Sequence, residues 1–398
     1  MGFAKQFFKD ISIGAFTAGF VAVLVGFTSS IAIVFQAALA FGASSAVISS
    51  WMWALGIGMG LCSVVPSLVL RKPVMVAWST PGAAVLAVGA GAAGAGFSMG
   101  DAVGAFMLSA GLVVLFGVTG WFEKIMDKIP VAVASALLAG VLARFGLQAF
   151  GAAQSAFALF AIMLATYLLG KRFAPRYAVP LTLLIAIIYV AYNDQMTLTS
   201  ANFAIAMPVF TAPRFTWEAA ISLALPLFIV TMASQNLPGV AAIRAAGYQM
   251  PISKLITLTG VATLLLAPFG GFALNLSAIT AAICMGKEAH PDPDKRYTAA
   301  VSCGAIYVVI GIFGSVVTAL LTAFPKELIA IIAGLALLGT IGSGLASALK
   351  DETHREAATI TFLVTLSGVV IAGVGSAFWG VVAGALAIFV QQYRLRSS

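Results

Sequence analysis

The sequence predicts an all-α polytopic membrane protein with 14 transmembrane segments. These form two inverted seven-segment repeats, with half-helices and short strands in segments 3 and 10. Three observations predict this fold class: an apolar composition, basic residues gathered on one side, and two hydrophobic stretches broken by Pro and Gly at matching places. Of 398 residues, 61% are hydrophobic and 9% are charged, whereas a soluble domain carries about 25% charged residues. So apolar a chain must face lipid as well as its own interior.

Long apolar runs mark the candidate spans, because a transmembrane helix needs about 20 mostly apolar residues. The runs lie at 12–40, 45–70, 101–121, 129–150, 153–170, 178–193, 217–243, 252–267, 297–322, 325–349, 355–374 and 376–393. Two shorter runs, at 77–89 and 273–285, are too short to cross comfortably alone, and we expect them to be half-helices. Counting both gives 14 segments, and ignoring them gives 12.

The basic residues select one topology. With the N-terminus in the cytoplasm and 14 alternating segments, 18 of the 21 Lys and Arg residues fall on the cytoplasmic side. Only Arg214 and Lys326 fall outside, and Arg144 stays within a segment, where we interpret it as snorkelling or structurally paired. This asymmetry follows the positive-inside rule. We therefore expect a multi-pass protein of the cytoplasmic (inner) membrane with both termini in the cytoplasm.

The two halves of the chain resemble each other. Pro73 pairs with Pro268, and Pro130 pairs with Pro325, both at an offset of 195 residues. The first long segments of the two halves align at an offset of 205. Because seven segments is an odd number, the second half must be inverted relative to the first.

The broken stretches, residues 72–82 (KPVMVAWSTPG) and 267–277 (APFGGFALNLS), are the strongest functional signal. Such pairs of interrupted segments indicate the binding site of a transporter. We expect residues 74–76 and 269–273 to be extended and to pair, each followed by a half-helix that starts near 79–82 or 275–277. Helix N-termini carry partial positive charge, so two of them meeting near the midplane would bind an anion, most simply a carboxylate.

The side chains at these starts are candidate ligands. Hydroxyl and amide groups suit both helix capping and anion binding, and aromatic rings can stack on a flat apolar ligand. The polar candidates are Ser79, Thr80, Asn275 and Ser277, and the aromatic candidates are Trp78 and Phe272. The alternative interpretation is a pair of Pro-kinked helices with ordinary caps.

A second polar cluster lies in the eighth segment. Gln235 and Asn236 fall near the middle of an apolar run, where amides are costly unless they face protein or a cavity. Their counterparts in the first segment are Ser29 and, further along, Gln36. We predict a polar wall beside the half-helices, and hydrogen bonding between packed helices is the alternative.

Other classes of function find little support in the sequence. HExxH, GxSxG and P-loop motifs and metal-spaced clusters are absent from it, so we expect neither an enzyme nor a cofactor. The net charge of +8 comes from residues at helix ends and not from a basic patch with aromatics, so nucleic acid is not an expected partner. No buried carboxylate stands out as a proton carrier, which leaves the carboxylate of a substrate to share the proton.

Four strings resemble the benzoate:proton symporter family, BenE: residues 72–83 (KPVMVAWSTPGA), 234–239 (SQNLPG), 275–280 (NLSAIT) and 290–293 (HPDP). The resemblance covers essentially the whole chain. More distantly, the chain is similar to nucleobase and sulfate permeases with 7+7 inverted repeats. This resemblance implies a core domain (1–121 and 217–322) that moves like an elevator against a gate domain (122–195 and 323–398). It places the substrate between the half-helices.

The resemblance implies import of benzoate or a related aromatic carboxylate with a proton. Its partners would be that small molecule, a proton and the lipid bilayer, and a homodimer is compatible with the family. A nucleobase or inorganic-anion permease is the first alternative. The sequence departs from the nucleobase permeases at Gln235 and at Leu274 or Asn275, where those proteins carry acidic residues, and this departure suits an anionic substrate. A passive channel is a further alternative, which the interrupted segments disfavour.

Overall fold

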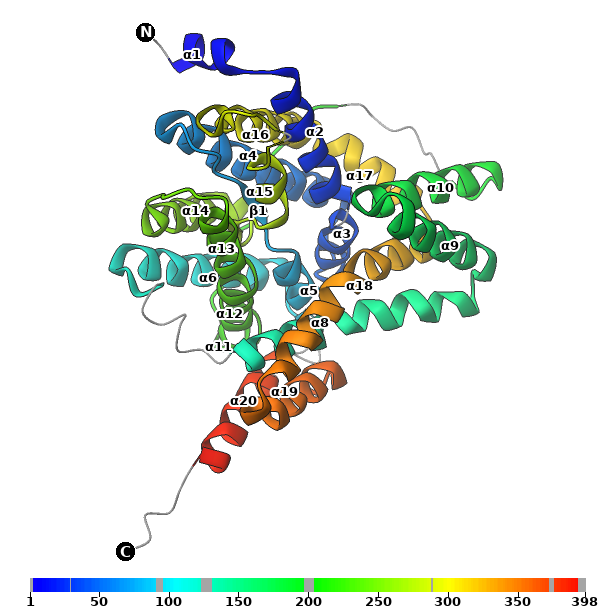
Figure 1. The fold of residues 1–398 in the computed structure, drawn as a ribbon. Coiled ribbons are helices and arrows are strands. Elements are labelled where there is room, and N and C mark those ends of the chain that lie inside the picture. The colour runs from blue at the N-terminus through cyan, green and yellow to red at the C-terminus, as the bar shows by residue number, and fades with distance from the viewer. Residues whose placement is uncertain are drawn as a thin grey trace, which may run out of the picture.

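The computed structural model describes residues 3–28, 30–90, 96–122, 131–196, 204–287, 289–371 and 376–392, and it is mostly helical (Figure 1). Among these residues, seven helices are long and apolar enough to cross a membrane. A bent pair, Pro293–Ile312 with Gly314–Ala323, makes eight if it is counted as one span. The chain is therefore a polytopic helical membrane protein, as the composition predicts.

The elements of the first half follow the predicted runs closely. They are α1 (Phe3–Asp10), α2 (Ile13–Thr28), α3 (Ile31–Ala40), α4 (Ser45–Leu70), β1 (Val76–Trp78), α5 (Thr80–Gly89), α6 (Met99–Thr119), α8 (Val131–Gly151), η2 (Ala152–Gln154), α9 (Phe157–Phe173), η3 (Pro175–Tyr177) and α10 (Ala178–Tyr192). Strand β1 and the short helix α5 together occupy the place of the predicted half-helix.

The second half repeats this order of long helix, strand, short helix and long helices. Its elements are α11 (Trp217–Ala219), η4 (Ala220–Ala224), α12 (Leu225–Thr231), η5 (Met232–Asn236), α13 (Leu237–Ala245), α14 (Ile252–Leu266), η6 (Ala267–Phe269), β2 (Leu274–Leu276), α15 (Ile279–Cys284), η7 (Pro293–Lys295), α16 (Tyr297–Ile312), α17 (Gly314–Ala323), α18 (Lys326–Lys350), η8 (Glu352–His354), α19 (Arg355–Ser367) and α20 (Ser376–Gln392). Elements α11 to α13 run on from one another.

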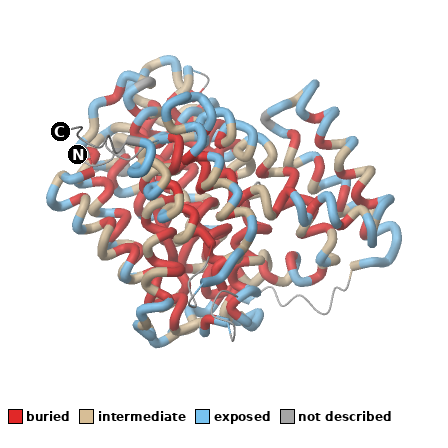
Figure 2. Tube along the Cα trace, turned by 90° about the horizontal axis from the view of Figure 1, so that it is seen from below, coloured by how far each residue is buried: buried red, intermediate tan, exposed pale blue. Residues whose placement is uncertain are grey.

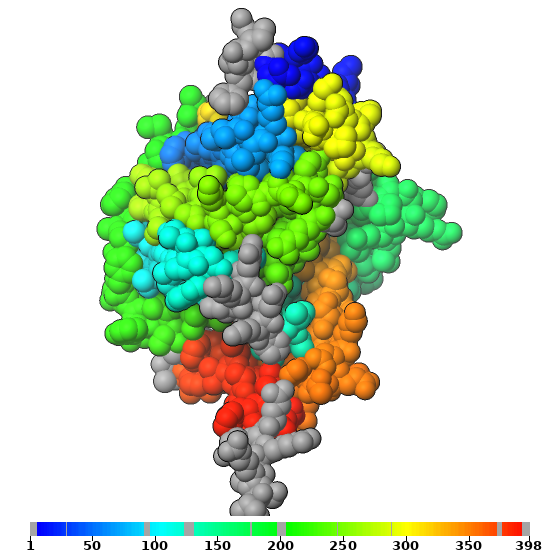
Figure 3. All heavy atoms as spheres, turned by 60° about the vertical axis from the view of Figure 1, so that its left-hand side comes forward, coloured from blue at the N-terminus to red at the C-terminus, as the bar shows by residue number. Residues whose placement is uncertain are grey.

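The helices pack as two groups that lie side by side (Figure 1). In the first group, α16 packs on α4 and α2, and α14 packs on α6. Figure 3 shows α6 in cyan and α14 in yellow-green side by side on one face, although they lie far apart in the sequence. In the second group, α8 packs along α18 and α19, and α9 packs on α10. Helix α5 belongs to the first group, where it packs on α3, and it also reaches α8.

Buried residues gather inside the molecule and exposed ones lie at its periphery (Figure 2). The largest fully buried side chains include Trp51, Phe106 and Phe272, which pack ring against ring with centroids 5.4–5.6 Å apart. Aromatic rings at such distances add to the stability that burial supplies. This cluster sits beside the strands and holds α4, α6 and the chain before β2 together.

One predicted span is not continuous. The sequence predicts a single helix over 297–322, but the chain bends by 68° between α16 and α17. Residues before α11 cross at this break, where Ala206 N donates to the freed carbonyl of Ile312 at 2.8 Å and the Ser315 hydroxyl bonds Ala204 O. Replacement of helix hydrogen bonds by bonds to another segment permits a kink without Pro.

Close backbone contact sets a testable requirement at Gly239, in α13. A Cβ there would lie 2.6 Å from Leu276 O in β2, whereas a Cβ at Gly111 in α6 would meet nothing within 4 Å. We expect Gly239→Ala to destabilise the protein by about 1–3 kcal/mol through overpacking. Gly111→Ala, the matched control, should be neutral or stabilising by up to about 1 kcal/mol. Thermal unfolding in detergent measures both, and an equal shift for the two variants would contradict the packing.

Candidate functional site

Two short strands form the centre of the candidate site. β1 and β2 pair antiparallel, with Val76 opposite Leu276, Ala77 opposite Asn275 and Trp78 opposite Leu274. Thus the two broken stretches, 195 residues apart, meet each other as predicted. β1 begins two residues later, and β2 five residues later, than the extended residues that the sequence predicts. The reason in the second stretch is a turn, because Gly270 adopts a left-handed φ of 95° and Gly271 N returns to Leu266 O.

Helix α4 satisfies the free edge of β1. Ser67 Oγ accepts from Val74 N at 2.9 Å, Ser63 Oγ accepts from Val76 N at 3.0 Å, and Met59 Sδ accepts from Trp78 N at 3.2 Å. Four helical residues rise about 6.0 Å, and two strand residues rise about 6.6 Å. Side chains at every fourth position of α4 therefore have nearly the same spacing as every second amide of the chain that runs antiparallel to it.

The free edge of β2 is satisfied in the same way by two other helices. Thr263 Oγ1 of α14 accepts from Leu274 N at 3.1 Å. Asn236 Oδ1 of η5 accepts from Leu276 N at 2.9 Å. Both side chains are buried, and an unpaired buried amide would cost about 1–3 kcal/mol. The strand pair thus depends on polar side chains from α4, α14 and η5.

Each strand leads into a short helix. Helix α5 starts at Thr80 with Ser79 as its N-cap, and Ser79 Oγ accepts from Gly82 N at 3.0 Å. Thr231 donates to the same Oγ at 3.0 Å. The second short helix, α15, starts at Ile279 and has no side-chain cap. The predicted start near 275–277 is therefore wrong for α15, because those residues are used by β2 and the turn after it.

A π-helical turn brings the polar pair of the eighth segment to the site. Residues Met232–Asn236 form η5 within the long span, and such π-turns are frequent at functional sites. The turn directs two neighbours differently: Asn236 bonds β2, whereas Gln235 lines a cavity. Both interpretations of the cluster therefore hold in part: the amide of Asn236 bonds a packed strand, and Gln235 lines a cavity.

That cavity, of about 480 Å³, lies between the two groups of helices, and we call it the half-helix cavity. From the first group it is lined by Thr80 and Pro81 at the start of α5, with Gln235 and apolar neighbours. Its remaining walls come from the second group. The full lining is Val25, Thr80, Pro81, Leu142, Lys171, Pro175, Val179, Pro180, Gln235, Ile279, Ile283, Ala336, Leu337, Gly339, Thr340 and Ser343. Lys171 is the single charged residue among these described ones.

The remaining predicted residues lie behind or away from this cavity. Trp78 Nε1 donates to Ser30 Oγ at 2.9 Å, and its ring lies 5.3 Å from that of Phe27. Phe272 belongs to the buried aromatic cluster. Ser277 Oγ accepts from Thr280 at 2.7 Å.

Three predicted residues stand apart. Asn275 is fully buried in β2; its Nδ2 donates to Ala273 O at 3.0 Å, and its Oδ1 has no partner among the described residues. Gln36 lines other cavities, at the far end of α5. Ser29 lies outside the described residues.

The sequence interpretation missed four bracing side chains, which are Met59, Ser63, Ser67 and Thr263. A signal for them exists: Met59, Ser63 and Ser67 follow one another at intervals of four, which places them on one face of a helix. Serines on one face of an apolar helix are also common at helix contacts. The spacing could have identified the face but not its strand partner.

The bond from Asn236 to β2 predicts a stability effect. Asn236→Ala leaves Leu276 N buried without an acceptor, so we expect a loss of about 1–3 kcal/mol in the free energy of unfolding. Asn193→Ala removes an amide that is exposed and bonds only Tyr189 O within its own turn, and should cost less than about 0.5 kcal/mol. Thermal unfolding in detergent compares the two, and equal losses would refute the bracing role.

The structure is that of a polytopic membrane protein with a cavity between its two groups of helices. Comparison with known proteins identifies a family of membrane transporters. Residues 9–390 match the family BenE, described as "Benzoate membrane transport protein". The chain is 38% identical over 386 residues to the "Benzoate membrane transport protein" of Acinetobacter baylyi, covering 97% of each chain. It is 47% identical over 373 residues to "Inner membrane protein YdcO" of Escherichia coli, covering 94% of each. The chain belongs to the BenE family.

Solved structures show the fold from a greater distance. The chain superposes on the transmembrane domain of the cyanobacterial bicarbonate transporter BicA with a TM-score of 0.58 at 15% identity, covering 94% of this chain and 97% of that one. SLC26A9 gives 0.67 at 12% identity, with coverage of 98% and 67%. At such identities the likeness concerns the fold alone, which is that of these anion-transporter structures.

Proposed function

We propose that this chain is a secondary active transporter that imports benzoate or a closely related aromatic carboxylate together with a proton. The observation that carries the proposal is the half-helix cavity. It joins the start of α5, an amide from a π-turn and one lysine to apolar walls, and it lies between the two groups of helices. Membership of the BenE family and the printed description of the Acinetobacter relative support the choice of substrate.

The lining suggests how such a substrate binds. The carboxylate lies at the N-terminus of α5, where Thr80 and Gln235 are hydrogen-bond partners and Lys171 adds positive charge. The ring lies against the apolar walls, which include Leu142 and Leu337. Among the described residues no carboxylate lines the cavity, and a like charge there would repel an anion in a low-dielectric site.

The residues behind the cavity hold this arrangement in place. Ser79 caps α5, Asn236 braces β2, and Ser277 bonds Thr280. Asn275 has an amide oxygen still available as an acceptor. In this proposal Trp78 and Phe272 shape the wall from behind and do not contact the ring, which refines the arrangement expected from sequence.

The position of the cavity also suggests the mechanism. We assign residues 1–121 and 217–322 to a core domain and 122–195 and 323–398 to a gate domain, with 14 segments in two inverted repeats and both termini in the cytoplasm. Because the cavity has walls from both domains, movement of the core along the gate would carry the substrate across, as in an elevator. A homodimer would hold the gate domains fixed.

Proton coupling gives the first functional test. In proteoliposomes, uptake of labelled benzoate should rise when the outside is made more acidic than the inside, and an ionophore that collapses the gradient should remove the increase. Vesicles without protein control for diffusion of the neutral acid, which the same gradient also drives. Protein-dependent uptake that ignores the gradient would overturn symport but not transport.

The binding residues give the second test. Thr80→Val and Gln235→Met keep volume but remove a hydrogen bond to a charged ligand, which is worth about 1.5–3 kcal/mol, or about 10–150-fold in KM. Thr119→Val is the matched control, since Thr119 is exposed and bonds only Leu115 O in its own helix. An unchanged KM in both site variants would exclude these residues from the site.

A permease for small inorganic anions is the second candidate. The structural likeness to a bicarbonate transporter and to SLC26A9 favours it, whereas the apolar walls of the half-helix cavity favour a ring. Competition against labelled benzoate by unlabelled benzoate, bicarbonate, chloride and uracil separates the candidates. Competition by bicarbonate but not by benzoate would replace our proposal with this one.

A further inference from the structure

Arg144 is a charged residue that the proposed transport site does not use. It lies in α8 and is half-buried, within an otherwise apolar helix. In the part of the chain that the structure describes, its guanidinium makes no hydrogen bond and no ion pair. It packs against the backbone at Gly368, where an added Cβ would lie 2.7 Å from Nη1. A charge within a membrane span is costly and is a functional candidate by default.

Arg144 also lines a cavity of about 470 Å³, which we call the Arg144 cavity. This size is within the range of small-molecule sites. Its walls come from three helices of both groups: Gln36 and Leu39 of α3, Val88 of α5, and Arg144 with Gln148 of α8. It therefore combines one cation and two amides with apolar surface, and no carboxylate of the described residues lines it.

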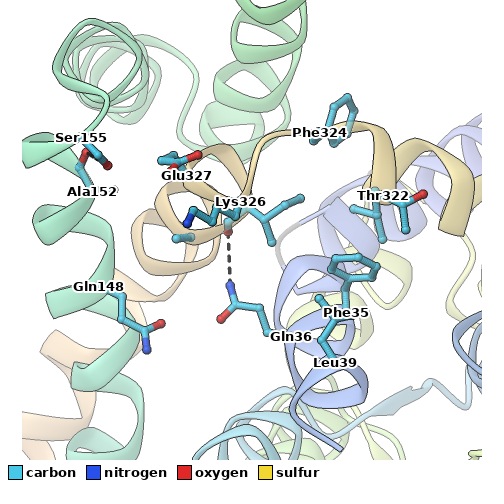
Figure 4. A pocket seen from close by; sticks show the side chains of 13 residues that line it. Phe35, Gln36, Leu39, Gln148, Ala152, Ser155, Thr322, Phe324, Lys326 and Glu327 are labelled. Carbon is cyan, nitrogen blue, oxygen red and sulfur yellow. Dashed lines mark hydrogen bonds between the residues drawn. The ribbon is translucent and has the colours of Figure 1, made fainter. Parts of the chain in front are cut away.

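A second space of about 600 Å³, the Lys326 cavity, shares Gln36, Leu39 and Gln148 with it. Figure 4 shows Gln148 of α8 and Gln36 of α3 on opposite sides of this space, with Lys326 and Glu327 at the start of α18. Gln36 Nε2 donates to Ile329 O at 3.5 Å. Across both cavities the charged residues are Arg144, Lys326 and Glu327, so Glu327 offsets only one of the two cations.

These cavities lie at the opposite end of α5 from the half-helix cavity. Thr80 and Pro81 line the half-helix cavity, whereas Ala87 and Val88 line the Arg144 cavity. Eight residues of helix separate Thr80 from Val88, which is about 12 Å. Along α18, likewise, Ile329 and Ala330 face the Lys326 cavity, and residues from Ala336 onward face the half-helix cavity. The two regions thus lie at opposite ends of the packed stretch of α5 and α18 between them, which we call the barrier.

We propose that the Arg144 cavity is a second binding site, for a monovalent carboxylate, on the side of the barrier opposite the transport site. Arg144 supplies a planar set of donors that matches a carboxylate in a bidentate pair. Gln36 and Gln148 supply amide donors around it, and Leu39 and Val88 supply apolar contact for the rest of the ligand. A substrate held there is concentrated at the barrier before the core domain moves. The choice of benzoate as ligand rests on the proposed function.

A cysteine reporter tests the site without requiring transport. Leu39→Cys places a thiol in both cavities and removes no polar ligand. The native Cys62, Cys284 and Cys303 are buried, with at most 4% exposure, and should not react. The measured quantity is the rate at which a negatively charged methanethiosulfonate reagent modifies the new thiol. Benzoate at ten times its Kd should slow the rate about tenfold, since occupancy follows mass action, and neutral benzamide should not slow it.

The dependence on Arg144 decides the proposal. In the Leu39→Cys background, Arg144→Gln should remove protection by benzoate, and Arg144→Lys should retain part of it. Arg214→Gln is the matched control, because Arg214 pairs with Asp101 at 3.6 Å, is 68% exposed and lines none of these cavities; protection should persist. Thermal unfolding of each variant confirms that it is folded.

Three results would overturn the second site. The first is that benzoate does not protect Leu39→Cys, and the second is that protection is equal after Arg144→Gln. The third is that vesicles of anionic lipid protect the thiol whereas benzoate in detergent does not. That third result would assign the guanidinium to a lipid phosphate. The outcome is separate from that of transport. Arg144-dependent protection without benzoate uptake would keep this site and reject the proposed function, and uptake without protection would do the reverse.

Discussion

The structure depends on satisfying the backbone of two strands inside a membrane protein. β1 and β2 bond each other along one edge only, so the outer amides of both strands would be unpaired in a medium without water. Five side chains accept them: Met59, Ser63, Ser67, Thr263 and Asn236. Each loss would leave a buried donor without an acceptor, so α4, α14 and η5 supply the hydrogen bonds that the strands cannot supply to each other.

This bracing explains why the polar residues near the site divide into two kinds. Ser79 accepts a hydrogen bond from the backbone of α5, and Asn236 accepts one from the backbone of β2. Thr80 and Gln235, the next residue and the previous one, face the half-helix cavity. A one-residue offset separates a bracing role from a lining role because consecutive residues point in different directions at a helix start and in a π-turn. The rigid strands thus position groups that remain available to a ligand.

Much of this could be predicted from the sequence. Closely spaced Pro and Gly within apolar runs located both broken stretches, since such clusters disfavour a continuous helix, and the lengths of the runs located nearly every helix. The later starts of the strands, by two residues in β1 and five in β2, could not be predicted, because they depend on a left-handed turn at Gly270 and on which amides reach α4. The bend at Phe313 depends on Ala206, more than 100 residues away. Such contacts between distant segments leave no local pattern.

The placement of Phe272 also could not be predicted from the sequence alone. An aromatic residue beside a broken helix fits a stacking role and a core role equally well, and only the presence of Trp51 and Phe106 at its ring selects the core. Arg144 is the converse case, since a cation in an apolar run was visible, but its lack of a partner was not. The surroundings distinguish the two: the ring of Phe272 is packed against Trp51 and Phe106, whereas Arg144 lines a cavity and has no ion-pair partner among the described residues. Lys171 lines the cavity at one end of α5, and Arg144 lines the cavity at the other end. In the proposed mechanism, a short displacement of α5 against α8 would therefore change which of two regions suited to an anion is open.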